Sequence, residues 1–487
     1  MRKAMKWLVT VLAVLMLSCA FVLTGCGRQA SVVSIERAES RGSDEVFTVT
    51  YSDGSTTELV ISGGEDGQDV TAEDLWQTYI EKTGDDITYE EFLEKYLTIE
   101  SGDNSAVIGK TLLSSMKVYT EFVEQTIVSG GFGQISRQEG VYIYTGGAVI
   151  YSMGEEYSYI LTNYHVVYNA DASGGNADGN ENGDNIARRI TCYLYGSEGE
   201  PSSTNSRDDY GYTLYDYGDY AIDCEYVGGS VAADIAVLRA ETQDILAVNE
   251  DACAVVLADG YEVGDTAYTI GNPENEGISV TQGIVSVDNE YITLDIDGTA
   301  RQYRSIRIDT PLYQGNSGGG LFNISGELIG IANAGNGSEE NINFAIPLPI
   351  VTGVADNIIH FYEDGDDSTS GLYTVDFTAS SAISSQNSKY VYDSSSGSGR
   401  IVEEAVLGAV RGIAEELGLE TGDIIQSFVL TRDGESTEYA IERTFDISDL
   451  LYTFRPGDTV YVNYKRDSQP LKSAEYTIAE GDFVSVA

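Results

Sequence analysis

The sequence predicts a protein that is mostly β-structure and has more than one domain. A chain of 487 residues is too long for one ordinary hydrophobic core. From about Lys110 onward, short runs rich in Val, Ile, Thr and Tyr are separated by turn residues. Their spacing is typical of a barrel or sandwich and not of alternating strand and helix units, so an all-β-dominated fold is expected.

The charge balance excludes one class of partner. The chain carries 27 Lys and Arg against 78 Asp and Glu, which gives a formal net charge of −51. Because no basic stretch is dense enough to hold a phosphate backbone, nucleic acid is not expected to bind. The acidic residues are interpreted as a solvated surface, with calcium binding or repulsion of anionic wall polymers as the alternatives.

The first residues have the organisation of an export signal. A basic start is followed by the apolar stretch Trp7–Leu23, which is too short and wrongly flanked for a membrane span and ends in small residues. The next residues complete "LTGC", which resembles the bacterial lipobox, where a signal peptidase cuts before the cysteine and the new N-terminus carries lipid. This resemblance implies that residues 1–25 are removed and that Cys26 anchors the protein at the bacterial cell membrane, facing outside the cytoplasm. An ordinary secreted protein is the alternative.

The other cysteines do not suggest a disulfide scaffold. Besides Cys19 and Cys26, the chain has Cys192, Cys224 and Cys253. Three cysteines form at most one intramolecular bridge, so stability has to come from packing.

Two small modules are expected between the signal and the β-rich region. Residues 26–62 contain two alternating β-type runs around the turn Ser52–Ser55, which predicts a hairpin behind the lipidated N-terminus. Residues 71–98 place apolar side chains at helical spacing after threonine N-caps. We therefore expect residues 63–105 to form a helical segment and a linker.

The stretch "QGNSGGGLFNISGELIGIA" (314–332) surrounds a single serine with glycines. A serine hydroxyl is a poor nucleophile at neutral pH, so it needs a neighbouring base, an acid that orients the base, and N–H groups directed at the oxyanion. Glycines let the backbone turn its N–H groups inward and let a substrate approach closely. The pattern makes Ser317 a candidate nucleophile.

The chain has two histidines, so the search for a base is short. His165 lies in "ILTNYHVV" at the end of an apolar run, where a loop can present it, whereas His360 lies in an expected helix beyond the serine. Asp234 is preferred as the orienting acid because it alone precedes the buried run "IAVL". Asp219 and Asp223 are its rivals.

The motifs "TNYHVV", "DIAVL" and "GNSGG", in this order, resemble the triad motifs of chymotrypsin-fold serine proteases, and specifically the HtrA/DegP group of envelope proteases. Supporting matches surround them: "TGGAVIY" (145–151), "GDTAYTIGNPENEGISVTQGIVS" (264–286) and "GELIGIANAGNGSEENINFAIP" (326–347). The similarity covers roughly residues 110–350 and keeps the order of the group.

This resemblance implies a chymotrypsin-like double β-barrel over residues 106–362 that hydrolyses peptide bonds through an acyl-enzyme. Ser317 would be the nucleophile, His165 the general base and then acid, and Asp234 the carboxylate that holds the imidazole in its productive tautomer. The N–H groups of Gly315 and Ser317 would form the oxyanion hole. No cofactor and no metal are expected.

Three positions bear on specificity and on departures from the group. Pro311 stands where trypsin-like enzymes keep an aspartate for basic side chains, so cleavage after small or medium apolar residues is expected instead. Tyr164 and Gly320 replace residues that are common in the group, and neither is expected to touch the chemistry.

Two long insertions rich in Gly, Asn, Asp and Tyr lie between the histidine and the aspartate. The first has a spacing that suggests a calcium loop, with Asp178, Asn180, Asn182 and Gly183 in place. Because its twelfth position is the cation Arg189, where an acidic ligand is required, a solvated loop is the preferred interpretation.

The C-terminal part changes character twice. Residues 363–398 form a Ser-rich segment, and its part 379–398 is expected to be a mobile loop or linker. Residues 399–487 resemble the PDZ domain that follows the protease in the HtrA group, on the pieces "GLETGDII" and "RPGDTVYVNYKRD". A PDZ domain captures a chain end as an added strand, but the glycine-containing carboxylate loop is not clearly present, and "GLYTVDF" (371–377) is its nearest candidate.

Together with the resemblances above, the sequence therefore predicts a lipid-anchored serine endopeptidase that cleaves unfolded or misfolded envelope proteins. The resemblance to the HtrA/DegP group also suggests a homo-oligomer. The alternative is a non-hydrolytic peptide-binding scaffold or chaperone on the same fold. The mechanism predicts a rate that falls as His165 is protonated, around the ordinary histidine pKa of about 6.5.

Overall fold

The computed structural model divides the chain into two compact units, residues 1–103 and 104–487. The residues that it describes are 32–37, 45–51, 56–61, 105–129, 135–335, 341–363, 371–378, 382–393 and 398–486. The predicted signal, Cys26 and the expected helices of residues 71–98 lie outside this set.

The first unit contains a three-stranded antiparallel sheet of β1 (Val32–Arg37), β2 (Glu45–Tyr51) and β3 (Thr56–Ile61). Strands β2 and β3 pair from Glu45 with Ile61 to Thr50 with Thr56, which confirms the predicted hairpin. The additional strand β1 pairs with β2 and was not distinguished in the sequence pattern.

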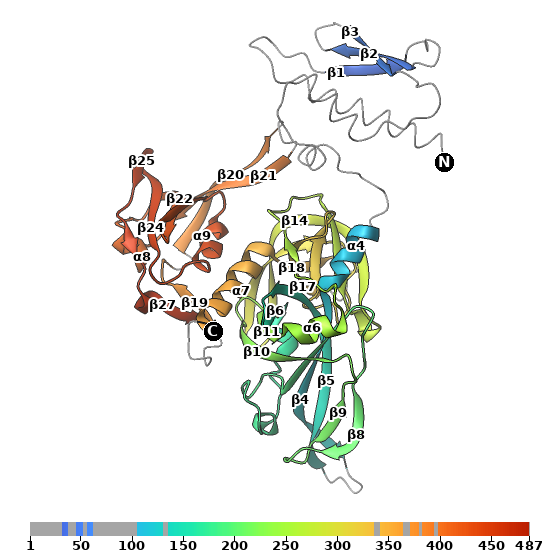
Figure 1. The fold of residues 1–487 in the computed structure, drawn as a ribbon. Coiled ribbons are helices and arrows are strands. Elements are labelled where there is room, and N and C mark those ends of the chain that lie inside the picture. The colour runs from blue at the N-terminus through green and yellow to red at the C-terminus, as the bar shows by residue number, and fades with distance from the viewer. Residues whose placement is uncertain are drawn as a thin grey trace. The chain divides into compact units, whose positions relative to one another are not determined.

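The second unit begins with two β-barrels (Figure 1). The first barrel is closed, in the order β10-β11-β6-β5-β4-β7. Its strands are β4 (Ser115–Ser129), β5 (Ile135–Met153), β6 (Tyr157–Thr162), β7 (Arg189–Leu194), β10 (Ile222–Ser230) and β11 (Ile235–Glu241). Strands β6, β7 and β11 are buried along almost their whole length, because both of their faces are covered.

The second barrel follows in the order β17-β16-β13-β14-β15-β18, and a further pairing of β17 with β18 closes it. Its strands are β13 (Thr266–Gly271), β14 (Ser279–Asp295), β15 (Ala300–Ile308), β16 (Gly320–Asn323), β17 (Glu327–Gly335) and β18 (Asn343–Pro347), with the short β12 (Val256–Leu257) paired to β17. The predicted double β-barrel is therefore confirmed.

One hydrophobic cluster joins the two barrels. It combines Val149 and Leu161 of the first barrel with Phe322 and Ile331 of the second. Helix α7 (Leu348–Glu363) contributes its buried face, including Val354, to the same cluster. Within the described part of the chain, no helix is both long enough and apolar enough to cross a membrane.

Short elements complete the region of the two barrels. They are α4 (Ser105–Thr111), η1 (Leu112–Ser114), α5 (Tyr164–Val167), η3 (Gly174–Ala177), α6 (Thr242–Val248), η4 (Pro273–Asn275) and the exposed hairpin β8 (Ser202–Arg207) with β9 (Thr213–Asp216). The hairpin belongs to the second predicted insertion.

Asparagine side-chain amides organise the first insertion, whose residue spacing suggests a calcium loop. Asn180 Nδ2 donates to the carbonyls of Gly183 and Ile186 at 3.0 and 2.9 Å, and Asn182 Nδ2 donates to Ala187 O at 2.9 Å. Arg189 pairs with Asp223 at 2.8 Å. These amides bind the loop's own backbone, which agrees with the interpretation as a solvated loop.

The C-terminal region is a separate sheet with its own core. The sheet runs β20-β21-β22-β24-β25, with β23 on β22 and β26 on β24, and β19 pairs with β27. The elements are β19 (Leu372–Val375), β20 (Ile383–Asp393), β21 (Ser398–Leu407), α8 (Ile413–Glu416), β22 (Ile424–Arg432), β23 (Glu435–Ala440), α9 (Thr444–Leu451), β24 (Thr459–Arg466), β25 (Gln469–Lys472), β26 (Tyr476–Thr477), η6 (Glu480–Asp482) and β27 (Phe483–Val486). Phe377, Phe428 and Phe454 lie in its core.

One prediction in this region is wrong. The serine-rich segment 379–398 was expected to be a mobile loop or linker, but most of it forms strand β20, which pairs with β21 from Ile383 to Asp393. Composition misses this strand because its residues are exposed on both faces, so serine is tolerated, while the hydrogen bonds to β21 are made by the backbone.

Candidate active site

Asp234 is a fully buried carboxylate in the turn between β10 and β11. Its Oδ2 lies 2.8 Å from Nδ1 of His165, and its Oδ1 accepts the backbone N–H of His165 at 3.0 Å. Asn163 holds the same turn, because its Nδ2 donates to the backbone carbonyl of Asp234 at 2.9 Å. The aspartate therefore fixes both the ring and the backbone of the histidine.

The hydrogen bond to Asp234 determines which nitrogen of the His165 imidazole carries the proton. Donation of Nδ1–H to the carboxylate leaves Nε2 unprotonated in the neutral ring. The side chain is 31% exposed, so part of the imidazole is open to solvent. Burial alone would lower the pKa of His165, but the charge and the hydrogen bond of Asp234 outweigh it, so the pKa lies above its ordinary value.

Ser317 lies in the turn that leads into β16, held between the two barrels. Its carbonyl accepts the N–H of Gly147 on β5 at 2.8 Å, and the N–H of Gly318 donates to Ala332 O on β17 at 2.9 Å. A Cβ at Gly146 would lie 2.8 Å from the Val166 side chain and 3.0 Å from Ser317 O. The residue after His165 and the candidate nucleophile thus lie against the same glycine.

Two glycines of the serine stretch are required by geometry. Gly315 has φ +98°, and a Cβ there would lie 2.2 Å from Asn272 O. Gly318 has φ +87°, and a Cβ there would lie 2.2 Å from both Gly147 O and Thr162 Oγ1. Only glycine combines a left-handed backbone with this close approach.

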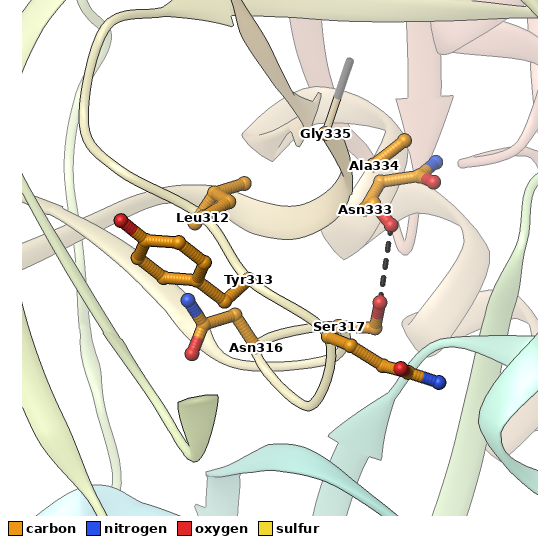
Figure 2. A pocket seen from close by; sticks show the side chains of 8 residues that line it. Leu312, Tyr313, Asn316, Ser317, Asn333, Ala334 and Gly335 are labelled. Atoms are coloured by element: carbon orange, nitrogen blue, oxygen red, sulfur yellow. Dashed lines mark hydrogen bonds between the residues drawn. The ribbon is translucent and has the colours of Figure 1, made fainter. Parts of the chain in front are cut away.

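The hydroxyl of Ser317 donates to Asn333 O at 3.2 Å, as the dashed line in Figure 2 marks. Asn333 is the extra residue of a β-bulge between Ala332 and Ala334 on β17, which turns its carbonyl toward the serine. The structure thus brings His165 and Asp234 into direct contact but directs the serine hydroxyl at β17. A hydrogen bond to the imidazole requires the hydroxyl to leave Asn333.

The predicted oxyanion donors are available. Neither the N–H of Gly315 nor that of Ser317 has a hydrogen-bond acceptor among the residues that the structure describes. The nearby carbonyls of Gln314 and Gly315 accept instead, from Glu274 and Asn272. The two N–H groups can therefore donate to a group that enters the site.

A cavity of about 340 Å³ opens beside the serine (Figure 2). The described residues that line it are Leu312, Tyr313, Gln314, Asn316, Ser317, Asn333, Ala334 and Gly335. No charged side chain is among them, so a basic substrate side chain finds no counter-ion in this part of the wall. Figure 2 shows Leu312 and Tyr313 on one side and Ala334 on the other.

The rival residues lie elsewhere. Asp223 on β10 accepts hydrogen bonds from Arg189 and Thr191, and Asp219 lies in an exposed turn. His360 lies on α7, where its ring meets the ring of Phe361 at a centroid distance of 5.1 Å. Of the three aspartates, the structure makes Asp234 the partner of His165.

Several residues of the site escaped the sequence analysis. Asn163 and Asn333 act through backbone contacts that no motif reports. The pair Gly146 and Gly147 stood inside a β-type run, where glycine often marks close approach of another backbone, and this signal could have identified them. Asn272, which contacts Gly315, lies in the segment 264–286, where no residue pattern indicates its role.

Comparisons with known proteins identify the family of domain and the relatives that this chain resembles. The trypsin-like peptidase domain family matches residues 140–331. The "Serine protease Do-like HtrA" of Lactococcus lactis is 27% identical over 358 residues, which cover 71% of this chain and 73% of that protein. The "Periplasmic pH-dependent serine endoprotease DegQ" of Escherichia coli is 30% identical over 253 residues, about half of each protein.

The chain is a serine endopeptidase with a trypsin-like fold, similar to the HtrA/DegP proteases. Among solved structures, an "HtrA-type protease AlgW with decapeptide" aligns with 77% of this chain and 98% of that chain, at 21% identity and a TM-score of 0.41.

Proposed function

We propose that Ser317, His165 and Asp234 form the catalytic triad of this HtrA-like endopeptidase. The contact between Asp234 and His165 Nδ1 at 2.8 Å carries the proposal, because it orients a partly exposed imidazole so that Nε2 is the nitrogen that accepts a proton. Ser317 lies beside a cavity and beside two N–H groups that have no acceptor in the described part of the chain, which supports its role as nucleophile.

In the proposed reaction, the Ser317 hydroxyl leaves Asn333 O, transfers its proton to Nε2 of His165 and attacks the carbonyl carbon of a peptide bond. The N–H groups of Gly315 and Ser317 receive the developing oxyanion. The imidazolium then protonates the departing amine, which leaves an acyl-enzyme on Ser317. A water molecule, deprotonated by His165, then attacks the carbonyl carbon of the acyl-enzyme. The ester bond to Ser317 breaks, the serine takes back a proton from His165, and the peptide acid is released.

We further propose that the substrates are unfolded or misfolded proteins of the cell envelope. The uncharged lining of the cavity supports the expectation of small or medium apolar residues before the cleaved bond. The export signal supports a location outside the cytoplasm, with Cys26 as lipid anchor. The separate C-terminal sheet and its core support a PDZ-like module over residues 399–487, and the group resemblance supports a homo-oligomer.

A fluorophosphonate probe tests the proposal directly. The purified mature protein and its Ser317→Ala variant are incubated with the probe, and the modified peptide is identified by mass spectrometry. We expect label on Ser317 in the wild type and none in the variant, with casein hydrolysis lost in parallel. Absence of label in the wild type, also after addition of unfolded protein, would contradict the proposal and favour a non-hydrolytic binding protein.

A further inference from the structure

The loop that follows β13, residues 272–277, packs against the serine stretch. The N–H of Glu274 donates to Gln314 O at 2.7 Å, and the N–H of Asn272 donates to Gly315 O at 3.3 Å. The missing side chain at Gly315 allows this approach, because a Cβ would lie 2.2 Å from Asn272 O. The loop therefore holds both carbonyls that flank the predicted oxyanion donor.

Because a peptide group is planar, the contact at the Gln314 carbonyl also fixes the direction of the Gly315 N–H. In a trans peptide the C=O of Gln314 and the N–H of Gly315 point in opposite directions. The peptide bonds of the described residues include no cis form. A hydrogen bond that fixes Gln314 C=O toward Glu274 therefore directs the Gly315 N–H away from the loop, where the structure offers it no acceptor among the described residues.

The loop does not hold this conformation by itself. Glu274 and Asn275 have φ values of +53° and +62°, which are left-handed for two successive residues that are not glycine. Such backbone is retained only where its surroundings over-determine it. The N–H of Glu274 thus keeps its direction only while other groups hold the loop.

The side chain of Asn272 supplies that support. It is fully buried, its Oδ1 accepts the N–H of Gly277 at 3.0 Å, and its Nδ2 donates to Thr145 Oγ1 at 2.8 Å. A second support comes from Tyr119, whose hydroxyl donates to Asn275 Oδ1 at 2.9 Å. Thr145 and Tyr119 lie on β5 and β4, so the loop of the second barrel is fixed by the first.

We propose that Asn272 is a positioning residue that holds the oxyanion hole in its competent form, through the Glu274 N–H and the peptide between Gln314 and Gly315. This inference rests on the proposed function, since it assumes that Gly315 donates to the oxyanion. The residue touches no substrate; it sets the direction of a donor that does.

The test compares Asn272→Ala with the control Asn323→Ala, in which the asparagine that ends β16 likewise loses two backbone hydrogen bonds, from the N–H groups of Ser325 and Glu327. Steady-state kinetics are measured on a peptide p-nitroanilide with valine before the cleaved bond. Loss of one oxyanion donor lowers kcat by roughly 10²- to 10³-fold, which sets the upper limit. We expect kcat of Asn272→Ala to fall at least tenfold with KM within twofold of the wild type.

The affinity of a peptide boronate of the same sequence separates a loss of the oxyanion hole from a general loss of structure. Its tetrahedral adduct places an oxygen in the oxyanion hole, so its affinity should fall by the same factor as kcat/KM. If Asn272→Ala stays folded and keeps kcat and boronate affinity within twofold of the wild type, the inference is wrong. A loss that lies entirely in KM would also contradict it.

If Asn272→Ala does not fold, variants of Thr145 test the same support of the loop, because Thr145 accepts the hydrogen bond from Asn272 Nδ2. Thr145→Val is isosteric but removes the acceptor of Asn272 Nδ2, whereas Thr145→Ser keeps it. We expect the valine variant to lose kcat and the serine variant to retain it; equal kcat in both overturns the inference. A wild-type protein that is inactive and unlabelled by the fluorophosphonate contradicts the proposed function itself, which separates the two failures.

Discussion

Asp234, which is buried, and Asp449, which is mostly buried, are carboxylates with different partners. Asp234 contacts the imidazole of His165, and the histidine side chain is 31% exposed. Asp449 on α9 pairs with Arg304 on β15, whose side chain is only 6% exposed. The guanidinium of Arg304 also lies over the ring of Phe445, 4.1 Å from its centroid. The partner of Asp234 is thus partly exposed, whereas the partner of Asp449 is buried.

The two partners differ in whether they can change their charge, and this separates a contact suited to catalysis from one that stabilises the fold. An imidazole gains and loses a proton near neutral pH, whereas a guanidinium stays charged. In the proposed triad, Asp234 would therefore control the protonation of His165, whereas the pair of Asp449 and Arg304 joins α9 to the second barrel. Burial raises the pKa of Asp449 to about 6, although the charge and hydrogen bond of Arg304 oppose this. The cost of burying that carboxylate is thus not fully compensated by its partner.

The largest expected effect is on catalysis. Asp234→Asn should lower kcat by roughly 10⁴-fold, because an amide in place of the carboxylate favours the wrong imidazole tautomer. Asp449→Asn should leave kcat of the folded protein within a fewfold of wild type. Both values are measured on the p-nitroanilide substrate, with folding checked by circular dichroism. A loss below tenfold in Asp234→Asn would exclude it from the triad.

The second expected effect is on the free energy of unfolding, and here the Asp449 variant is the one with the large change. Asp449→Ala leaves the Arg304 charge buried without its partner, so the free energy of unfolding should fall by about 3–5 kcal/mol. The control Asp223→Ala breaks an exposed pair with Arg189 and should cost less than about 1 kcal/mol. Urea unfolding of both variants gives the comparison. Equal losses would show that the pair of Asp449 and Arg304 does not hold α9 in place.

The smallest effect is a shift in pH dependence. The base must be neutral, and Asp234 raises the pKa of His165, so activity should fall with decreasing pH at a midpoint above about 6.5. Since the chain has two histidines, imidazole NMR signals can be assigned with a His360→Gln variant. We expect the His165 pKa to decrease in Asp234→Asn and to stay unchanged in Asp449→Asn. A wild-type midpoint below 6.5 would contradict the role of Asp234.

Much of the site could be predicted because its signals are local. Ser317 lies among glycines, His165 is one of two histidines, and Asp234 directly precedes a buried strand, so residue type and neighbours suffice. The strand β20 was missed for the converse reason: a serine-rich composition describes side chains, whereas the pairing of β20 with β21 is made by the backbone.

The sequence by itself determined the order of the motifs, the fold class and the residues capable of the chemistry, because these follow from residue type and short-range pattern. Only the tertiary structure decided that the Ser317 hydroxyl points at Asn333 and that the serine stretch is supported from the other barrel. Asn272 and Thr145 are 127 positions apart, and Tyr119 and Asn275 are 156 apart. Contacts over such separations exist only once both barrels have closed and packed together, so no local pattern reports them.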